Sequence, residues 1–448
     1  MPLSKSHPIK FTGPVVMLVA TSIGCATGDA LEEGGSIVQI DGSSDGSSSS
    51  DVSSATWGDD PFDDDHGDGT GDSGGEGSEE SGDGSGGTDD DGSGNGNADD
   101  DYEYSKIIRI PASEVHGTDA HDDFPVFISL VDADLHDHAR DGGCDISFVQ
   151  DSTPLAFELE QFDIDHTATE AKLAAWVKIP SLSTTSDTVI ELKYGQACGS
   201  YDDPTGVWGD DYELVWHMNS VVDAQTMDST ARALDGSVYG EPLVEDGKLG
   251  KSMVLDGVDD RVVGPFASEL GVDGNEPRTF SVWANIQNYD STVHGDVFGI
   301  GRLGGGCCAF NGYSIRRGVG VVSFSVGGEW SQNANWVIFE DGTGFDEWVH
   351  YVAVYDGEMG LELYANGVLI QDISIYSELH NPEGDLDTLD DTPLSMPYMV
   401  DSLIGGPRDE MRVSRRVRSA GWIETEYANQ SDPNGFYQVG PEVATPTM

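Results

Sequence analysis

Residues 361–370, LELYANGVLI, form two short apolar runs on either side of an Asn-Gly pair. Asn-Gly between apolar runs is the strongest short-range pattern for a β-hairpin, because both residues tolerate the positive φ angles of a tight turn. Outward from this hairpin, residues 348–355 form a near-continuous apolar run. Phe280, Val282 and Ala284 alternate with their neighbours, as in a strand with one buried face. The second half of the chain is therefore expected to be β-rich.

The first half shows the same organisation. Short runs rich in β-branched and aromatic residues are separated by turn residues, and they lie at 107–110, 124–131, 145–149, 155–162, 173–179 and 188–194. Their spacing is typical of a β-sandwich, and no long segment has the apolar period of a helix. One short helix is expected near the end, with Ser419 as its N-cap and Trp422, Ile423 and Tyr427 on its apolar face. The predicted fold class is all-β.

The chain is strongly acidic. Its 448 residues include 82 Asp and Glu against 21 Lys and Arg, for a net charge of -61. Nucleic acid is not expected as a partner, because phosphate binding relies on clustered Lys and Arg, and acidic lipid headgroups are equally poor partners. Divalent cations are the natural counterions. The one basic cluster is expected to neutralise the acidic surface locally, and it consists of Arg408, Arg412, Arg415, Arg416 and Arg418.

The N-terminus has the pattern of an export signal. After a short basic start comes an apolar run at 15–20 that is too short for a stable membrane span. Residues 22–25, Ser-Ile-Gly-Cys, resemble the lipobox of bacterial lipoproteins, although Ser22 stands where Leu is usual. The resemblance implies a diacylglycerol on Cys25 and a place at the outer membrane or cell surface, with membrane contact only through this lipid. The alternative is an ordinary secretory signal cut near Ala26, and either way the chain is exported.

These patterns divide the chain into segments. Residues 1–25 are the expected signal peptide, 26–103 a disordered linker, 104–218 a first β-sandwich, 219–440 a second β-sandwich and 441–448 a tail. The linker is rich in Asp, Gly and Ser and has no Lys or Arg. It cannot bury enough apolar surface to offset the entropy lost on ordering, and its runs of Asp repel one another and extend it.

Residues 104–218 resemble a bacterial module known only as domain of unknown function 2341. The matching residues are 124–126, 145–148, 158–160, 176–180, 194–195 and 215–218. Tyr194-Gly195 departs from the usual Tyr-Tyr-Gly-Asn run. The module has no assigned activity, so the resemblance implies architecture, a sandwich that commonly precedes a jelly roll.

The second sandwich resembles the laminin-G-like, concanavalin-A-like jelly roll of bacterial surface proteins. The matching residues are 247–252, 255–262, 280–283, 348–350, 364–367, 409–413, 418–423 and 426–427. Members of this family typically bind glycans, proteins or calcium. The resemblance therefore implies a jelly roll with a recognition role.

Calcium is the cofactor that the sequence favours. It takes roughly six to eight oxygen ligands from carboxylates and carbonyls. Asp256, Asp259 and Asp260 supply three carboxylates from one turn, and Asp409 begins a strand that the resemblance places in the same sandwich. The structural alternative is that Asp256 only closes a turn and that Asp409 pairs with a nearby Arg.

A glycan or an envelope protein is the expected partner. Trp330 and Trp336 lie among Gly and amide residues that include Asn333 and Asn335, and these four form the predicted ligand site. Aromatic rings beside amides suit sugar stacking and hydroxyl hydrogen bonds. The alternative is a hairpin whose Trp caps the sandwich edge. The Trp residues in strongly apolar patterns are expected in the core, and they are Trp283, Trp348 and Trp422.

The cysteines fit an exported protein. Cys144 and Cys198 both lie in the first predicted sandwich, and a bridge between them is expected. It would close a loop of about 55 residues, worth roughly 4 kcal/mol in the loop-entropy model. Cys307 and Cys308 are adjacent and could be bridged, free or metal-bound. His136 and His138 could bind a transition metal, but a solvated loop is the preferred interpretation.

No catalytic motif is found. The fragment at 383–387, Glu-Gly-Asp-Leu-Asp, comes nearest to the alternating carboxylates of jelly-roll glucanases, but it lies in a Pro- and Asp-rich loop. Asp409 and Glu410 are neighbours on a predicted strand, so their side chains are expected to diverge. We therefore expect a non-enzymatic, surface-exposed lipoprotein whose jelly roll binds its ligand. A polysaccharide hydrolase and a purely structural envelope component are the alternatives.

Overall fold

Strands dominate the part of the chain that can be described. The computed structural model describes residues 102–164, 169–199, 201–209, 211–287, 295–303, 310–318, 321–326, 335–339, 346–357, 361–370, 388–390, 392–397 and 404–445. Within these ranges the structure is all-β, with four sheets and a few short helices. The predicted fold class is confirmed.

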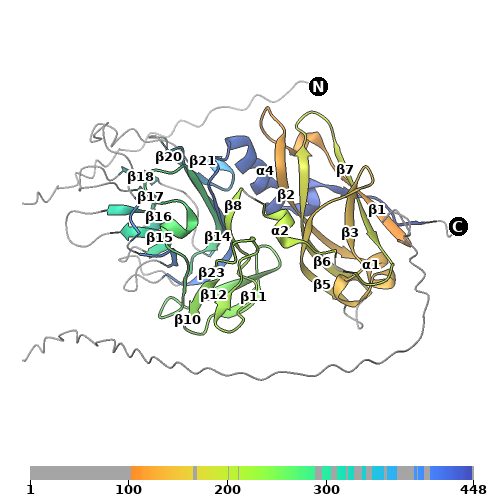
Figure 1. Cartoon of the computed structure of the whole chain (residues 1–448), viewed down its shortest axis with the longest axis horizontal. Coiled ribbons are helices and arrows are strands. Elements are labelled where there is room, and N and C mark those ends of the chain that lie inside the picture. Colours follow the sequence, from red (N-terminus) through yellow and green to blue (C-terminus); the bar gives the residue numbers. More distant parts are fainter. Residues whose placement is uncertain are drawn as a thin grey trace, which may run out of the picture. The chain divides into compact units, whose positions relative to one another are not determined.

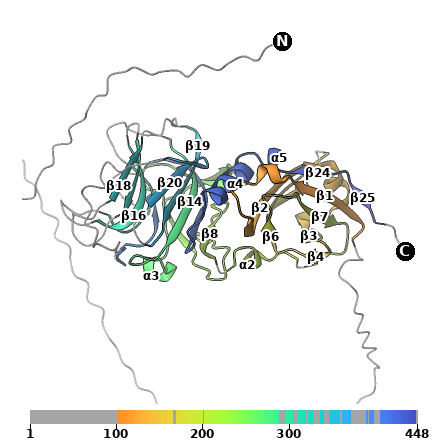
Figure 2. The same cartoon turned by 90° about the horizontal axis from the view of Figure 1, so that it is seen from above.

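The first sandwich consists of a larger sheet packed against a smaller one (Figures 1 and 2). The larger sheet has the order β24-β1-β7-β3-β4, with β25 also paired to β1, and the smaller is β2-β6-β5. The strands are β1 (Tyr104–Ile110), β2 (His121–Asp132), β3 (Ser147–Gln150), β4 (Thr153–Pro154), β5 (Phe157–Ile164), β6 (Ala171–Leu182), β7 (Thr188–Tyr194), β24 (Gln438–Val439) and β25 (Val443–Ala444). Helices α1 (Ala133–His138) and α2 (Pro204–Val207) and two 3₁₀ turns, Ala112–Glu114 and Asp141–Gly143, connect them.

The core of this sandwich lies between the two sheets. Alternate residues of β1 and β7, such as Ile108 and Leu192, pack against residues of β2 and β6, such as Val126 and Val177, and all four are fully buried. Cys144 and Cys198 form a disulfide with a Cα–Cα distance of 4.8 Å, which confirms the predicted bridge. The bridge ties the start of β3 to the segment that follows β7.

The second sandwich consists of two long sheets. One has the order β11-β12-β23-β14-β19-β20-β21 with β8 paired to β23, and the other has the order β18-β17-β16-β15-β22-β13-β10-β9. The strands are β8 (Tyr212–Trp216), β9 (Gln225–Thr226), β10 (Gly236–Tyr239), β11 (Leu243–Asp246), β12 (Lys251–Leu255), β13 (Arg261–Val263), β14 (Arg278–Asn285), β15 (Gly295–Leu303), β16 (Phe310–Gly318), β17 (Val321–Val326), β18 (Asn335–Phe339), β19 (Trp348–Tyr355), β20 (Leu361–Ala365), β21 (Val368–Leu369), β22 (Ser395–Met396) and β23 (Gly406–Ser414). Helix α3 (Ala267–Leu270) follows β13.

The predicted hairpin joins β20 and β21. Tyr364 pairs with Leu369 and Ala365 with Val368, and the two turn residues between them, Asn366 and Gly367, have φ angles of 52° and 75°. Both angles are positive, as a type I′ turn requires. The Asn-Gly pair therefore sets the register of this edge of the sheet.

The sheet that contains β14 is covered on both faces, which explains why its strands are so apolar. Phe280 and Val282 belong to the core between the two sheets of the second sandwich. Trp283 points the other way and stacks on Tyr427 of helix α4 (Ala420–Ser431), at 5.8 Å between ring centroids. A strand that is buried on both faces loses its simple alternation.

Helix α4 packs between β2 and the sheet of β14 and β19 (Figures 1 and 2). It begins as predicted, because the Ser419 side chain accepts a hydrogen bond from the N–H of Trp422 at 3.2 Å. Trp422 lies 4.6 Å from Phe124 of β2, and Asn429 bonds to the backbone of Phe127 in the same strand. The short helix α5 (Pro433–Phe436) follows and leads the chain back to β1.

Strand pairing divides the chain differently from the sequence-based boundaries. We placed 212–216 with the first sandwich, but β8 pairs with β23 of the second. We placed 438–440 in the second sandwich and 441–448 in a tail, yet β24 and β25 both pair with β1 of the first. The second sandwich is thus inserted between strands of the first. The described residues of both sandwiches belong to one compact unit.

Two further observations bear on placement. No helix among the described residues is long and apolar enough to cross a bilayer. The predicted signal, linker and Cys25 lie outside the described residues.

Candidate functional site

The predicted calcium turn joins β12 to β13. Asp256 closes it: its Oδ1 accepts hydrogen bonds from the N–H groups of Val258, Asp259 and Asp260 at 2.7, 3.2 and 3.3 Å. Gly257 has a φ angle of 73°, which an L residue rarely adopts. This local chemistry gathers three carboxylates on one turn, and we call Asp256, Asp259 and Asp260 the rim cluster.

The rim cluster has the spacing of a cation site. Ligand atoms of its three residues lie within 4.8 Å of one another. Asp256 and Asp259 are exposed and Asp260 is buried. The backbone N–H of Val258 lowers the pKa of Asp256, whereas burial raises the pKa of Asp260. One turn therefore holds one carboxylate whose charged form is stabilised, Asp256, and one whose charged form is disfavoured, Asp260.

A cavity opens beside the rim cluster. Its volume is about 580 Å³, and the cluster lines it together with Gly240, Glu241, Leu243 and Val254. Leu243 is 61% exposed. The mouth thus combines acidic groups with exposed apolar surface, as sites for ligands with both characters do.

Asp409, the fourth predicted calcium ligand, lies elsewhere. It is fully buried on β23, and its Oδ2 accepts hydrogen bonds from the N–H groups of Lys248 and Leu249 at 2.8 and 2.9 Å. It does not belong to the group of mutually close ligands formed by the rim cluster. The sequence placed Asp409 on a strand of the same sandwich but could not show which residues its side chain meets.

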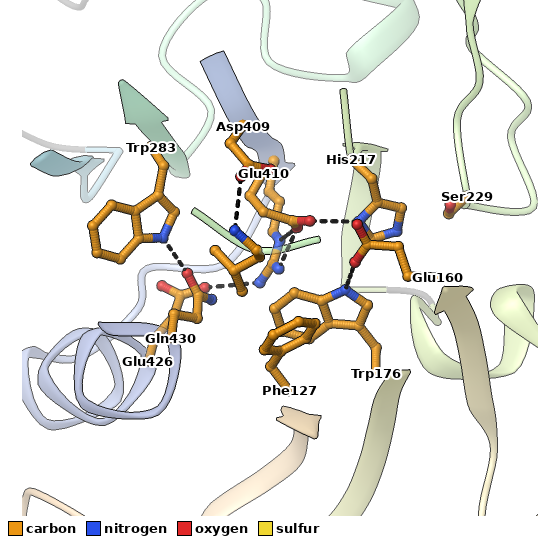
Figure 3. Close-up of polar contacts among 12 residues, drawn as sticks. Phe127, Glu160, Trp176, His217, Ser229, Trp283, Asp409, Glu410, Glu426 and Gln430 are labelled. Atoms are coloured by element: carbon orange, nitrogen blue, oxygen red, sulfur yellow. Dashed lines mark hydrogen bonds and ion pairs between the residues drawn. The ribbon is translucent and has the colours of Figure 1, made fainter. Parts of the chain in front are cut away.

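Asp409 instead belongs to a second group of carboxylates, where the first sandwich meets the second. We call Glu158, Glu160, His217, Asp409 and Glu410 the junction cluster, and Figure 3 labels the last four of them. Its glutamates come from β5 and β23, and His217 directly follows β8. No sequence segment contains more than two of its members.

Two β-bulges aim the side chains of this cluster. The register of β5 on β6 shifts between Leu159 and Gln161, which leaves Glu160 at the irregularity. The register of β14 on β23 also shifts, and there Glu410 has a φ angle of 54°. Bulges often re-aim a side chain at a functional site. The prediction that Asp409 and Glu410 diverge is wrong, because the bulge brings both into one cluster.

His217 lies between two carboxylates. Its Nδ1 is 2.7 Å from Glu410 Oε1, and its Nε2 is 2.9 Å from Glu158 Oε2. Burial lowers the pKa of His217, but the charges of Glu158 and Glu410 outweigh burial and raise it well above the usual value. The imidazole is therefore held as a cation that joins the two sandwiches.

Arg412 is the second buried cation. It donates to Glu410 Oε2 at 2.6 Å and to Glu426 of α4 at 3.1 Å. Its guanidinium lies 4.1 Å from the ring centroid of Trp176 and 4.6 Å from that of Trp208. A planar, weakly hydrated cation between two indoles suits a dry site.

Two carboxylates of the cluster are less well compensated. Burial raises the pKa of Glu160 to about 8, with a further contribution from Glu410. Burial, then Glu410 and Glu160, raises the pKa of Asp409 well above its usual value. Glu160 Oε2 accepts a bond from Trp176 Nε1 at 3.1 Å, but Glu160 Oε1 and Asp409 Oδ1 are buried and have no partner among the described residues.

Several predicted residues lie outside the described part. These are Trp330, Asn333, Cys307, Cys308 and the fragment 383–387. Asn335 and Trp336 lie on β18, of which only the backbone is described. The predicted sugar site, with its four side chains, therefore lies outside what the structure describes and stays a prediction.

Other predictions can be compared with the structure. Trp283 and Trp422 are buried, and Trp348 is partly buried. The segment with His136 and His138 is helix α1 rather than a loop, and their Nδ1 atoms contact Asp137 and Glu442 at 2.9 and 2.8 Å.

The expected surface role of the Arg cluster is wrong for three of its members. Arg408, Arg412 and Arg418 are only 0, 2 and 9% exposed. Arg408 donates to backbone carbonyls, and Arg412 serves the junction cluster. Arg415 and Arg416 are exposed and form ion pairs with Glu213 and Asp211. The burial of Arg408 and Arg412 follows from the position of β23 in the middle of its sheet, whereas Arg418 follows β23 and lies over the ring of Trp422, 3.9 Å from its centroid.

Sequence reasoning did not assign a role to Glu158, Glu160 or His217. A usable indication was present, because Glu158 and Glu160 interrupt an apolar strand at alternate positions. Charged residues in such a strand must find partners if the face is covered. Glu160 accepts a hydrogen bond from Trp176 and Glu158 contacts His217, and these partners are 16 and 59 positions away, so their identity depends on strand pairing.

Comparison with known proteins identifies the second sandwich. Residues 257–424 match the concanavalin A-like lectin/glucanases superfamily, of laminin G type. The match includes Asp259, Asp260, Asp409 and Glu410 but not Asp256, Glu158, Glu160 or His217. No curated protein sequence matches the chain. The resemblance of 104–218 to the module of unknown function stays a prediction.

Solved structures show a limited likeness. The binding domain of Paraclostridial Mosquitocidal Protein 1 is 13% identical with a TM-score of 0.38, and the receptor binding domain of botulinum neurotoxin C/D mosaic serotype is 14% identical with the same score. The binding domain of botulinum neurotoxin DC, solved with rat synaptotagmin II, is 13% identical with a TM-score of 0.37. Each match covers 49% of this chain and 52% of the other, about half of each. These values say nothing about what this chain binds.

Proposed function

We propose that this chain is an exported, non-catalytic recognition protein that binds a glycan or protein ligand with its concanavalin A-like sandwich, assisted by calcium at the rim cluster. The observation that carries the proposal is the coincidence of three close carboxylates with a cavity of about 580 Å³ in that sandwich. Lipid attachment at Cys25, and with it a cell-envelope location, remains an expectation from the sequence.

The oxygen atoms of the rim cluster suit calcium. Asp256 uses only Oδ1 for its backbone hydrogen bonds, so its Oδ2 is available, and Asp259 is exposed. Asp260 is already engaged, since its two oxygens accept bonds from the N–H groups of Glu241 and Asp256 at 2.9 Å each. A carboxylate oxygen has two lone pairs, so Asp260 can still contribute to an ion. Carbonyl groups and water would complete the shell.

The same geometry argues against hydrolysis at this cavity. A glycosidase needs two carboxyl groups that flank the scissile bond from opposite sides. Asp256, Asp259 and Asp260 all come from one turn, so they approach a ligand from the same side. Glu241 is the other acidic residue in the lining, and its backbone is bonded to Asp260. Recognition therefore fits the cavity better than bond cleavage.

The test uses the full chain, freed of metal with a chelator. Calcium should raise the melting temperature, because a ligand stabilises only the state that binds it, by about 2.7 kcal/mol at a hundred times Kd. Asp259→Asn should weaken calcium binding in titration calorimetry by at least about tenfold. Asp122→Asn, an exposed Asp of β2, is the matched control and should bind calcium like the wild type.

A glycan array, read with calcium and then with chelator, tests recognition itself. We expect binding that Asp259→Asn and chelator both reduce. If calcium leaves the melting temperature unchanged, the calcium part of the proposal is wrong. If calcium binds but neither glycans nor envelope proteins are retained in either condition, the recognition role is wrong.

A further inference from the structure

The junction cluster differs from the rim cluster in two ways, because it contains a histidine and its members come from separate strands. We propose that Glu160, His217 and Glu410 form a binding site for one divalent transition-metal ion of the class of Zn²⁺ and Co²⁺. Ligand atoms of these three residues lie within 4.8 Å of one another. Figure 3 shows the free oxygen of Glu160 pointing toward the contact between Glu410 and His217.

The backbone is shaped to bring these ligands together. Glu160 and Glu410 each lie at a register shift of their strand. β8 pairs with β23 through Trp216 and Met411, so His217 and Glu410 are the next residues along the two strands. Three separate strands therefore bring Glu160, His217 and Glu410 to one point. Ion pairs between flexible surface residues would not require such an arrangement of the backbone.

The charge at the junction favours a further cation. Carboxylates come from Glu158, Glu160, Asp409, Glu410 and, through Arg412, from Glu426, and all five residues have little exposed surface. Before an ion binds, the cations in direct contact with them are His217 and Arg412, and an ion that binds His217 would take the place of one ring proton, which is released. Lys248 lies near Asp409, where its charge acts from a distance. Acidic groups still outnumber basic groups, and burying all of them as charges is costly in a site of low dielectric constant unless a further cation joins them.

Independent support comes from buried oxygen atoms. Asp409 has no exposed surface, and its Oδ1 has no hydrogen-bond partner among the described residues. The same holds for Oε1 of Glu160. Buried polar atoms are nearly always paired in folded proteins, so each exception requires an explanation. An ion bound between Glu160 and Glu410 would supply a partner for Glu160 Oε1 and a nearby positive charge for Asp409 Oδ1.

A tight turn encloses the site. Gly247 and Gly250 join β11 to β12, and a Cβ atom on them would lie 2.6 Å from Asp409 Oδ2 and 2.7 Å from Glu160 Oε1. Only glycine allows the backbone to approach both carboxylates this closely. Glu160 remains partly exposed, so an ion can reach the site from solvent.

The donor atoms decide the class of ion. One imidazole nitrogen with carboxylate oxygens suits Zn²⁺ and Co²⁺, whereas Ca²⁺ prefers oxygen ligands alone. Glu160 belongs to the first sandwich and Glu410 to the second, so a bound ion would fasten the two together. The rim cluster and the junction cluster would then bind ions of different chemistry.

The experiment titrates metal-free full chain with Co²⁺. We expect one Co²⁺ per chain, a visible d–d absorption band, displacement by Zn²⁺ but not by Ca²⁺, and a higher melting temperature. Glu160→Gln should weaken Co²⁺ binding by at least about tenfold, since it removes one ligand but keeps an oxygen for Trp176. Asp259→Asn at the rim is the control and should leave Co²⁺ binding unchanged.

X-ray absorption of the Zn²⁺-loaded wild type needs no variant and covers the case in which Glu160→Gln does not fold. One imidazole with oxygen ligands is expected. Sulfur ligands would overturn the proposal and transfer the metal to the cysteines. Absence of Co²⁺ and Zn²⁺ binding, or binding that Glu160→Gln leaves unchanged, would also overturn it and leave the junction cluster as a network held by protons and hydrogen bonds alone.

Discussion

The rim cluster and the junction cluster use the same functional group in opposite ways. The rim carboxylates come from five consecutive residues, and two of the three are exposed. The junction carboxylates come from distant strands and are buried between the sandwiches. Backbone N–H groups lower the pKa of Asp256, whereas burial and neighbouring carboxylates raise that of Asp409.

This difference shows what each cluster depends on. Water and local backbone groups stabilise charge at the rim, so the turn keeps its carboxylates without help from distant residues. At the junction the same charges are stable only because Arg412 and His217 lie among them. Removing a cation should therefore have a large effect at the junction, and removing an equivalent group at the surface should have a small one.

The largest effect is expected for Arg412→Met. This change removes the partner of Glu410 and Glu426 and leaves both carboxylates buried. Breaking a buried ion pair from one side costs about 3–5 kcal/mol of the free energy of unfolding. Urea denaturation measures it. Arg412→Lys keeps the charge but loses the forked contacts, so its loss should be intermediate.

Arg416→Met is the surface counterpart of that experiment. Arg416 is 66% exposed in its side chain and pairs with Asp211 at 2.7 Å. Exposed pairs contribute about 0–1 kcal/mol. Equal losses for Arg412→Met and Arg416→Met would contradict the distinction between the two regions.

Local features could be predicted from the sequence, and features that depend on pairing could not. The Asn366-Gly367 hairpin, the Ser419 N-cap and the rim turn are each set by residues within about five positions, so their chemistry is visible in the chain itself. The Cys144–Cys198 bridge was also predictable, because only these two cysteines lie in the first sandwich.

The junction cluster needed the register of β8 on β23 and two bulges, and neither is encoded in a short motif. Asp409 illustrates the limit. Its sandwich was predicted, but an irregularity at Glu410 decided which residues it meets. Likewise the return of β24 and β25 to β1 could not be inferred, because a two-residue strand carries no periodic pattern.

A smaller effect is expected from the titration of His350. This residue is 1% exposed, stacks on Trp283 at 5.0 Å and faces Arg412 and Glu426. Burial, with Arg412, lowers its pKa to about 3. In the unfolded chain His350 takes up a proton near pH 6.5, whereas in the folded chain it stays neutral down to about pH 3. The stability contributed by neutral His350 is therefore present above about pH 6.5 and is lost as the pH falls toward 3.

The slope of stability against pH provides the measurement. One such group contributes up to about 1.4 kcal/mol per pH unit in this window. His350→Phe keeps a ring beside Trp283 but cannot take a proton, so the slope between pH 4 and 6.5 (about the unfolded value) should decrease. An unchanged slope would mean that His350 is not held neutral. Asp256→Asn should not alter the slope between about pH 5 and 6.5, because the pKa of Asp256 lies below its usual value and an unfolded Asp takes up its proton mainly below about pH 5.

A small effect is also expected at the rim, for Asp256→Ala in metal-free protein. The change removes the acceptor of three backbone N–H groups, but Asp256 is exposed and water can replace its oxygen. We expect a loss of about 1 kcal/mol in the free energy of unfolding, typical of one net hydrogen bond. Asp256→Asn keeps an oxygen at the same position and should remain close to the wild type. Urea denaturation with chelator present separates this effect from any loss of calcium binding. A loss as large as that of Arg412→Met would show that the rim turn supports the sandwich rather than only itself, and the contrast between a local, solvated cluster and a buried, long-range one would then fail.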